Sequence, residues 1–243
     1  MTYNKTQLNP ETTFEKHVYH RDQFAHYLRW SHVLKIARIG QKILDFGCGS
    51  GNMFEVFYRN RYKPEYYLGL DIRKQTIEKL NKKWKALNYV NFAEVDLCNP
   101  KLNYGANWDI ITCFEVIEHI GHENAPVFLD NIKKHMNKDT ILLLSTPCYD
   151  EKVGAAANHI IDDKVGEFTY EALHTLLIDR FNIIANYGTF ASQKDYKPML
   201  DGAFEFFFNK LKEYYDSNLV SVIMAPFFPE HSRNVLWKLK LPQ

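Results

Sequence analysis

A buried strand that runs directly into a glycine loop is the feature that most constrains the fold of this chain. Within residues 42–46, Ile43, Leu44 and Phe46 have the apolar density of a parallel strand covered on both faces, and Gly47, Gly49 and Gly51 follow them. Glycines at these positions let the backbone turn tightly against a ligand. Residues 52–58 carry apolar side chains at helical spacing, so the N-terminus of a helix points at the same place. Strand, loop and helix together predict a ligand site in an α/β domain.

The spacing of the glycines indicates which ligand binds there. A dinucleotide fold requires G-x-G-x-x-G, but the third glycine would fall at Asn52 counting from Gly47, and at Phe54 counting from Gly49. Asp45, two residues before the first glycine, would repel a phosphate and suits a ligand with a positive end. S-adenosylmethionine has a ribose, an adenine, an ammonium and a sulfonium, and no phosphate. The pattern therefore predicts S-adenosylmethionine and disfavours nicotinamide-dependent oxidation.

A second strand, expected over residues 66–71, ends in Asp71, twenty residues beyond Gly51. An acid at this place binds the ribose hydroxyls in a βαβ nucleotide site. With this acid the chain resembles the class I S-adenosylmethionine-dependent methyltransferases, whose signature is D-x-G-x-G-x-G followed by G-x-D. The resemblance covers roughly residues 40 to 190. It implies an α/β fold with a seven-stranded, doubly wound, mostly parallel sheet whose last strand is antiparallel.

The resemblance also implies a set of cofactor ligands around the carboxyl ends of the strands. Asp96, near the end of a third strand expected over residues 90–97, matches the place that meets the adenine amine, although a simple turn acid is the alternative. The residues expected to bind S-adenosylmethionine are Asp45, Gly47, Cys48, Gly49, Gly51, Asp71, Ile72, Asp96, Leu97 and Glu115.

The acceptor side is expected around the segment E-V-I-E-H at residues 115–119, which follows a fourth buried strand. This segment resembles two methyltransferase groups: the polyprenyl catechol O-methyltransferases of ubiquinone biosynthesis and the small-RNA 3′-terminal 2′-O-methyltransferases. In the RNA enzymes, two glutamates and a histidine of this motif hold a divalent metal with a later histidine. The resemblance implies Glu115, Glu118, His119 and His159 as metal ligands. If a helix begins at Glu115, the first three side chains converge on one face.

A metal-free interpretation stays open, because E-V-I-E-H also occurs in many metal-free small-molecule methyltransferases and the residues around His159 match poorly. In that case Glu115 lies beside the cofactor, Glu118 is on a helix surface, and His119 is a general base or a substrate contact. The candidate catalytic residues are His119, Glu118 and His159. The helix expected from residue 20 to 37 offers Arg21, His26, Tyr27 or Arg29 toward the methionine carboxylate or the substrate.

Other methyltransferase classes lack support in the sequence. Enzymes that methylate amino groups of nucleic-acid bases are expected to carry Asn/Asp-Pro-Pro-aromatic after the fourth strand, where this chain has residues Phe114 to Ile117. A cytosine C5 enzyme has its Pro-Cys nucleophile at the same strand end, whereas Pro147 and Cys148 follow the fifth strand. We therefore expect methylation of a hydroxyl of a small molecule, a nucleotide or RNA. The alternative is a non-catalytic S-adenosylmethionine-binding module that engages a protein or nucleic-acid partner.

Length and composition predict one domain. The chain has 243 residues, of which 46% are apolar, enough for one sizeable core. We expect an N-terminal arm and helix over residues 1–39, a cofactor-binding core over 40–190, and a substrate-lid insertion with the last strand over 191–243. In the insertion, an aromatic stripe at helical spacing is expected to be core; it comprises Phe204, Phe207, Phe208, Leu211, Tyr214 and Tyr215.

Charge and cysteine usage indicate the cellular setting. The formal net charge of +1 gives no overall attraction to nucleic acid or to an anionic membrane. Cys48, Cys98, Cys113 and Cys148 lie far apart without a C-x-x-C pair, as expected for free thiols in a reducing cytosol. No apolar run approaches the roughly 18 residues of a membrane span, and no signal peptide is recognised. The sequence predicts a cytoplasmic protein and leaves its oligomeric state open.

Overall fold

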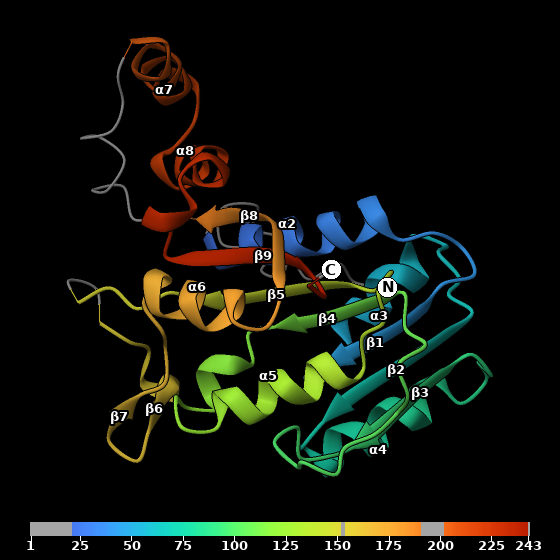
Figure 1. Ribbon diagram of the computed structural model, residues 1–243. Coiled ribbons are helices and arrows are strands. Elements are labelled where there is room, and N and C mark those ends of the chain that lie inside the picture. The colour runs from blue at the N-terminus through green and yellow to red at the C-terminus, as the bar shows by residue number, and fades with distance from the viewer. Residues whose placement is uncertain (1–20, 152–153, 191–201, 243) are drawn as a thin grey trace, which may run out of the picture.

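The structure is a computed structural model that describes residues 21–151, 154–190 and 202–242 (Figure 1). Its centre is a seven-stranded sheet in the order β3-β2-β1-β4-β5-β9-β8. The strands are β1 (Lys42–Phe46), β2 (Tyr66–Asp71), β3 (Val90–Glu94), β4 (Ile110–Phe114), β5 (Ile141–Pro147), β8 (Asn182–Phe190) and β9 (Asn234–Lys240). Strands β1 to β5 pair in parallel, and β9 lies antiparallel between β5 and β8. The predicted fold class is confirmed.

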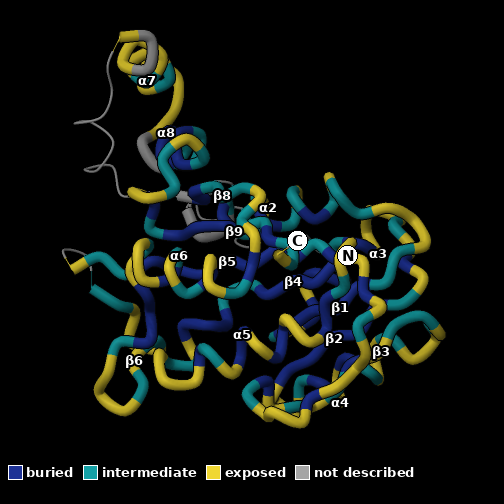
Figure 2. The backbone as a smooth tube through the Cα atoms, viewed as in Figure 1, coloured by how far each residue is buried: buried dark blue, intermediate teal, exposed yellow. Residues whose placement is uncertain are grey.

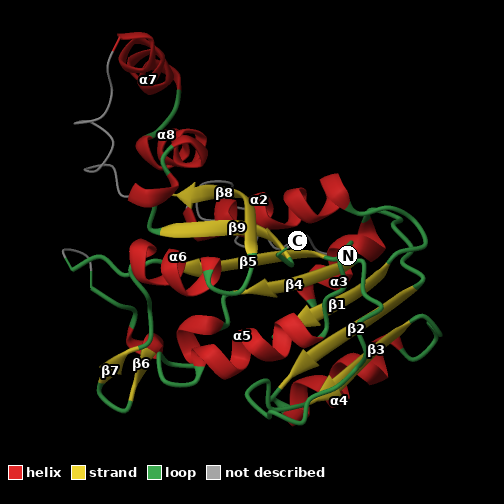
Figure 3. Ribbon diagram, viewed as in Figure 1, coloured by secondary structure: helices red, strands yellow, loops and turns green. Residues whose placement is uncertain are grey.

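Helices cover both faces of the sheet (Figure 3). They are α2 (Arg21–Ile36), α3 (Asn52–Arg59), α4 (Lys74–Trp84), α5 (Ala125–Lys134), α6 (Tyr170–Ile178), α7 (Gly202–Tyr214) and α8 (Ser217–Met224). Side chains of α2, α3 and α4 pack with Ile43 of β1 on one face, whereas those of α5 and α6 pack with Leu44 and Phe46 on the other. Strand β1 is therefore buried on both faces, as the apolar density of Ile43, Leu44 and Phe46 predicts.

The order of the strands determines which edge of the sheet can bind a ligand. The chain moves outward from β1 through β2 to β3, and then returns to the other side of β1 as β4. Such a reversal opens a crevice at the carboxyl ends of the central strands, which is where α/β sheets bind ligands. Figure 2 shows the strands as a buried centre, with more exposed loops at their ends. The glycine loop after β1 and the segment after β4 face this crevice.

The insertion between β8 and β9 departs from the expectation. Helices α7 and α8 project from the sheet beside β8 (Figure 1). Phe208 and Leu211 of α7 pack on a small cluster of α8, but Phe207, Tyr214 and Tyr215 are exposed. The aromatic stripe is thus only partly core, because α7 packs along one side against α8 and lies away from the main sheet. The expected N-terminal arm before residue 21 and residues 191–201 of the insertion lie outside the described residues.

Two further sequence expectations concern the whole chain. All four cysteines are unpaired, as predicted. Among the helices within the described residues, none has the length and apolar character needed to cross a membrane.

Candidate functional site

A cavity of about 500 Å³ lies at the carboxyl ends of β1 to β4. Seven residues expected to bind the cofactor line it: Gly47, Gly49, Asp71, Ile72, Asp96, Leu97 and Glu115. The three other expected ligands, Asp45, Cys48 and Gly51, are not part of its lining. Arg73, Phe114, Val116, His119 and Ile120 complete the wall.

The glycine loop is shaped by two close approaches. Gly47 has a φ of 77°, and a Cβ there would clash with the side chain of Val116. Gly51 has a φ of 75° and caps the N-terminus of α3, where a Cβ would lie 2.7 Å from Leu80. Both positions require the left-handed backbone that glycine adopts without strain. The loop can therefore approach a ligand closely, although Gly51 itself supports the helix and does not line the cavity.

Asp71 reaches the cavity as an ionised and well-bound carboxylate. The amide of Gly49 donates to its Oδ2 at 2.9 Å, and Nε of Arg73 donates to its Oδ1 at 2.9 Å. Partial burial opposes ionisation, but the hydrogen bonds from Arg73 and Gly49 outweigh it and lower the pKa of Asp71. Asp71 thus holds the glycine loop and offers negative charge to a ligand. Arg73 was not anticipated from the sequence.

Asp45 lies beneath the loop, in the interior. Its carboxylate is buried and accepts hydrogen bonds from the hydroxyls of Tyr67 and Thr112, the latter at 2.8 Å. Burial raises the pKa of Asp45 to about 6, against the opposing effect of these hydrogen bonds. Cys48 is also buried, and burial raises the pKa of its thiol. Neither of these two side chains lines the cavity.

Glu115 stands at the boundary of the cavity, in an unusual backbone conformation. It follows β4 with a φ of 57°, ahead of a short 3-10 helix, η3 (Ile117–His119). Its carboxylate accepts hydrogen bonds from Ser145 at 2.9 Å and from Asn234 at 2.8 Å, and pairs with Nη1 of Arg29 at 2.7 Å. A helix does not begin at Glu115, so the condition under which Glu115, Glu118 and His119 would converge on one helical face is not met.

Arg29 is the buried residue by which α2 reaches the site. Its side chain is 2% exposed. Besides Glu115, it contacts Nδ1 of His26 at 2.7 Å and Oδ1 of Asn234 at 3.4 Å. Of the four residues considered on this helix, His26 and Arg29 line a second cavity, and Tyr27 faces elsewhere.

This second cavity, of about 570 Å³, adjoins the first. Glu115 and His119 line both cavities. Its wall is rich in ionisable and amide side chains, which are His26, Arg29, Glu115, Glu118, His119, Asn158, His159, Glu167, Arg233 and Asn234. A donor molecule in the first cavity and a polar acceptor in the second would meet beside Glu115 and His119.

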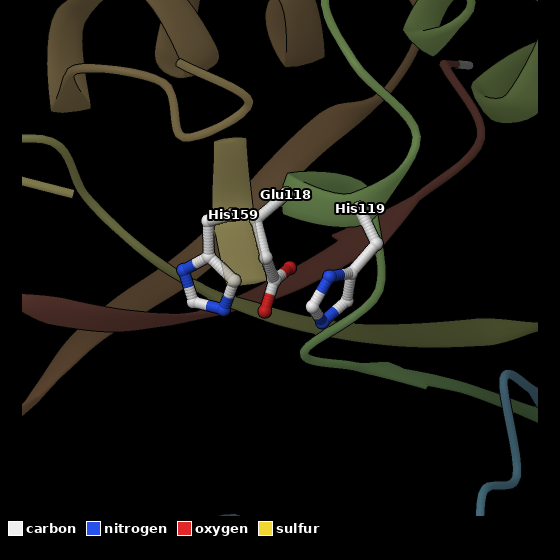
Figure 4. A group of neighbouring side chains, drawn as sticks. All are labelled: Glu118, His119 and His159. Atoms are coloured by element: carbon white, nitrogen blue, oxygen red, sulfur yellow. The ribbon is translucent and has the colours of Figure 1, made fainter. Parts of the chain in front are cut away.

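Three of the expected metal ligands line the second cavity, and their side chains lie together (Figure 4). Ligand atoms of Glu118, His119 and His159 lie within 4.8 Å of one another. Glu115 is not part of this group, because its carboxylate is bound to Arg29, Ser145 and Asn234. Oxygen and nitrogen donors of this kind suit a divalent cation.

Glu118 is the buried member of the cluster. It is fully buried, so its alternative placement on a helix surface is wrong. The hydroxyl of Thr146 donates to its Oε2 at 2.8 Å, while Oε1 has no hydrogen-bond partner among the described residues. Burial and the charge of Glu115 raise the pKa of Glu118 well above its ordinary value. A cation beside Oε1 would satisfy this oxygen.

The two histidines are presented by different segments. His119 ends η3, and His159 ends a second 3-10 helix, η4 (Ala157–His159). The rings lie 4.8 Å apart between centroids. Burial and the neighbouring His159 lower the pKa of His119, which favours its neutral ring. Cys148 at the nearby strand end is buried with a pKa raised to about 12 by that burial, as expected for an unreactive loop thiol.

Known proteins with similar sequences share one domain type. A family model described as a methyltransferase domain matches residues 19–193. The chain is 30% identical over 109 residues to the ubiquinone biosynthesis O-methyltransferase of Rickettsia typhi, covering 43% of this chain and 40% of the relative. The protein of the same name from Rickettsia akari is 29% identical over 123 residues, covering 50% and 43%. The matched region thus spans less than half the length of these curated relatives.

Solved structures with the same fold are more distant in sequence. A putative methyltransferase in complex with the Trm112 methyltransferase activator, from Haloferax volcanii, matches with a TM-score of 0.62 and 13% identity over 98% of this chain and 96% of that chain. A TehB-like S-adenosylmethionine-dependent methyltransferase from Corynebacterium glutamicum matches with a TM-score of 0.58 and 13% identity, covering 88% and 87%. These likenesses establish a common fold.

Proposed function

Because this chain belongs to the methyltransferase family and is a class I S-adenosylmethionine-dependent enzyme, we propose that it methylates a hydroxyl group of a small polar molecule, a nucleotide or an RNA. The observation that carries this proposal is the junction of the two cavities at Glu115 and His119. The sulfonium methyl is already activated, so the protein mainly has to align donor and acceptor and remove the hydroxyl proton.

On the donor side, the charges and positions of the residues in the first cavity support a specific placement of S-adenosylmethionine. Asp71 would bind the ribose hydroxyls, and Asp96 with Leu97 would meet the adenine. Gly47 and Gly49 would lie against the cofactor through their backbone. The buried Asp45 lies behind the cavity wall and would not contact the cofactor directly. Its charge would attract the positive end of the cofactor from beneath the loop.

On the acceptor side, the lining favours a polar substrate. The second cavity has two arginines, three glutamates and three histidines in its wall, together with Asn158 and Asn234. A polyprenyl chain would replace the water around these polar groups with hydrocarbon, which is unfavourable for them. We therefore favour a hydroxyl on a polar molecule over a polyprenyl catechol. Methyl transfer to a hydroxyl oxygen agrees with the name of the curated relatives.

A divalent metal would complete the acceptor site. Glu118, His119 and His159 would hold it, since they provide three clustered ligand atoms and one buried carboxylate oxygen without a partner among the described residues. When bound, such an ion would lower the pKa of an acceptor hydroxyl. In the metal-free alternative, the neutral ring of His119 would take the hydroxyl proton itself.

A methyl-acceptor screen with radiolabelled donor over nucleotides, RNA, DNA and phenols tests the proposal. We expect incorporation into a hydroxyl-bearing acceptor, and none in His119→Ala, while S-adenosylhomocysteine binding stays nearly intact. His231→Ala, which replaces a half-exposed histidine outside both cavities, is the matched control and should be fully active.

The variants also separate the two mechanisms and the binding-module alternative. With metal, Glu118→Ala is inactive too, and a chelator inhibits the wild type reversibly. Without metal, the chelator has no effect and only His119→Ala is strongly impaired. Full activity in His119→Ala would refute both mechanisms. Binding of S-adenosylhomocysteine without turnover on any acceptor would favour the non-catalytic module.

A further inference from the structure

We propose that Glu167, held by Arg233, is a positioning residue that fixes the tautomer of His159, so that Nε2 of this ring presents a lone pair to Glu118. The reason for fixing this tautomer, which is to hold a metal at the acceptor site, rests on the proposed function. The hydrogen bonds of the His159 ring do not depend on that function.

A small hairpin brings His159 and Glu167 together. Strands β6 (Ile160–Ile161) and β7 (Lys164–Val165) pair in antiparallel fashion directly after His159. Asp162 and Asp163 form its turn with φ values of 47° and 62°. The amide of Gly166 donates to the carbonyl of His159 at 2.8 Å, which closes the open end of the hairpin. Residues eight positions apart thus become neighbours.

Glu167 is buried between two basic groups. Its Oε1 lies 2.6 Å from Nδ1 of His159, and its Oε2 lies 2.6 Å from Nη2 of Arg233. The second contact is an ion pair whose alignment falls outside that of a hydrogen bond. The guanidinium of Arg233 is fixed in turn by the carbonyls of Cys148 and Gly154. The carboxylate is therefore held from both sides.

This arrangement decides where the proton of His159 resides. A carboxylate only accepts hydrogen bonds, so Nδ1 of His159 must carry the hydrogen. In the neutral ring, Nε2 is then unprotonated. Figure 4 shows that the ring edge opposite Nδ1 turns toward Glu118.

His119 follows the same rule with a different partner. Its Nδ1 lies 3.2 Å from the carbonyl oxygen of Asn158, which also only accepts. In its neutral ring, Nε2 of His119 is therefore also unprotonated. Outer partners of this kind orient ligating histidines and raise their basicity. The partner of His119 is a backbone carbonyl, whereas the partner of His159 is the charged side chain of Glu167. Glu167 can therefore be substituted without altering the backbone.

The substitution Glu167→Gln makes the proposal testable, because it keeps the size of the side chain. Arg233 can only donate, so the amide oxygen of the glutamine should turn toward it and the amide NH2 toward His159. The amide of Ala156, 3.3 Å from Oε1, favours the opposite orientation, but Arg233 is closer and charged. Nδ1 of His159 would then accept, and the proton would move to Nε2.

Long-range 15N–1H NMR of the metal-free protein, at a pH where the ring is neutral, reads the tautomer directly. We expect Nδ1–H for His159 in the wild type and Nε2–H in Glu167→Gln, with His119 unchanged as an internal reference. Calorimetry with Mn²⁺ alone should show a loss of affinity of about 10- to 100-fold. Glu171→Gln, at an exposed position on α6, is the matched control and should change neither readout.

An Nε2–H tautomer in the wild type would overturn the proposal without any variant. An unchanged tautomer in a folded Glu167→Gln would overturn it as well. Failure of the proposed function is seen separately, because full activity in His119→Ala would refute it while the NMR result for His159 still stands.

Discussion

Asp71 combines two tasks in one carboxylate, since it anchors the glycine loop through Gly49 and faces the cavity where the ribose is proposed to bind. Asp71→Ala should therefore bind S-adenosylhomocysteine at least about tenfold more weakly, because a charged hydrogen bond contributes roughly 1.5–3 kcal/mol. Isothermal titration calorimetry measures this loss. Asp139→Ala, at an exposed turn, should bind normally. Equal affinities of the Asp71 variant and the wild type would show that the ribose binds elsewhere.

Glu118 illustrates a conflict between stability and function at a single residue. Burial disfavours its charged form, so the neutral Glu118→Gln should make the metal-free protein more resistant to urea at neutral pH. Gln also retains an oxygen for the Thr146 hydroxyl. The same variant should lose Mn²⁺ binding in calorimetry, because the carboxylate charge is gone. A variant that is less stable, or that still binds Mn²⁺ like the wild type, would contradict this account.

Sequence reasoning located the residues whose role depends on local spacing. Gly47, Gly49 and Asp71 lie close together because a strand followed directly by a tight loop leaves few other positions for these residues. Arg73, Glu167 and Arg233 were missed. Arg233 reaches Glu167 across 66 positions of sequence, a contact created by sheet pairing that no periodicity reveals.

At the scale of elements, the ion pair between Arg29 and Glu115 helps to hold helix α2 over the site. Arg29→Met should destabilise the protein by roughly 1–3 kcal/mol, because Glu115 loses its cationic partner and remains partly buried. Urea unfolding gives this difference. Lys35→Met removes an exposed cation from the same helix and should lie within about 0.5 kcal/mol of the wild type. Equal stability of the two variants would mean that α2 is held by its apolar contacts alone.

The elements predicted correctly are those with a clear apolar pattern. Strand β1 has apolar residues on both of its faces, Ile43 on one and Leu44 and Phe46 on the other, and its burial on both faces follows from them. The hairpin of β6 and β7 was missed because two residues per strand are too few for any alternation. The spacing in α7 predicted a buried stripe, yet Tyr214 is 78% exposed, because spacing alone does not tell whether a partner element lies opposite.

At the scale of the whole molecule, Asp45 links stability to pH. Its pKa is raised to about 6 in the folded protein, above the value of about 3.9 expected in the unfolded chain. Between these values the folded state binds more protons, so its stabilisation falls as pH rises through this window and remains reduced above it. The loss is on the order of 3 kcal/mol, from about two pKa units.

Asp45→Asn removes this dependence, because an amide does not ionise. The variant should exceed the wild type in free energy of unfolding at pH 7.5, and the difference should shrink markedly by pH 4.5. Urea titrations at both pH values, with Asp139→Asn as the exposed control, provide the comparison. A pH-independent difference would mean that Asp45 is not the titrating group.

Strand β9 has a consequence for the order in which the protein is made. It lies between β5 and β8, both synthesised earlier, and β8 has no other strand neighbour among the described residues. It also carries Asn234, the partner of Glu115, directly after Arg233, the partner of Glu167. On the ribosome, the side of β5 that β9 later covers stays open while the glycine loop and Asp71 are already in place. A nascent chain can therefore hold the complete cofactor segment and still lack an acceptor site until β9 emerges.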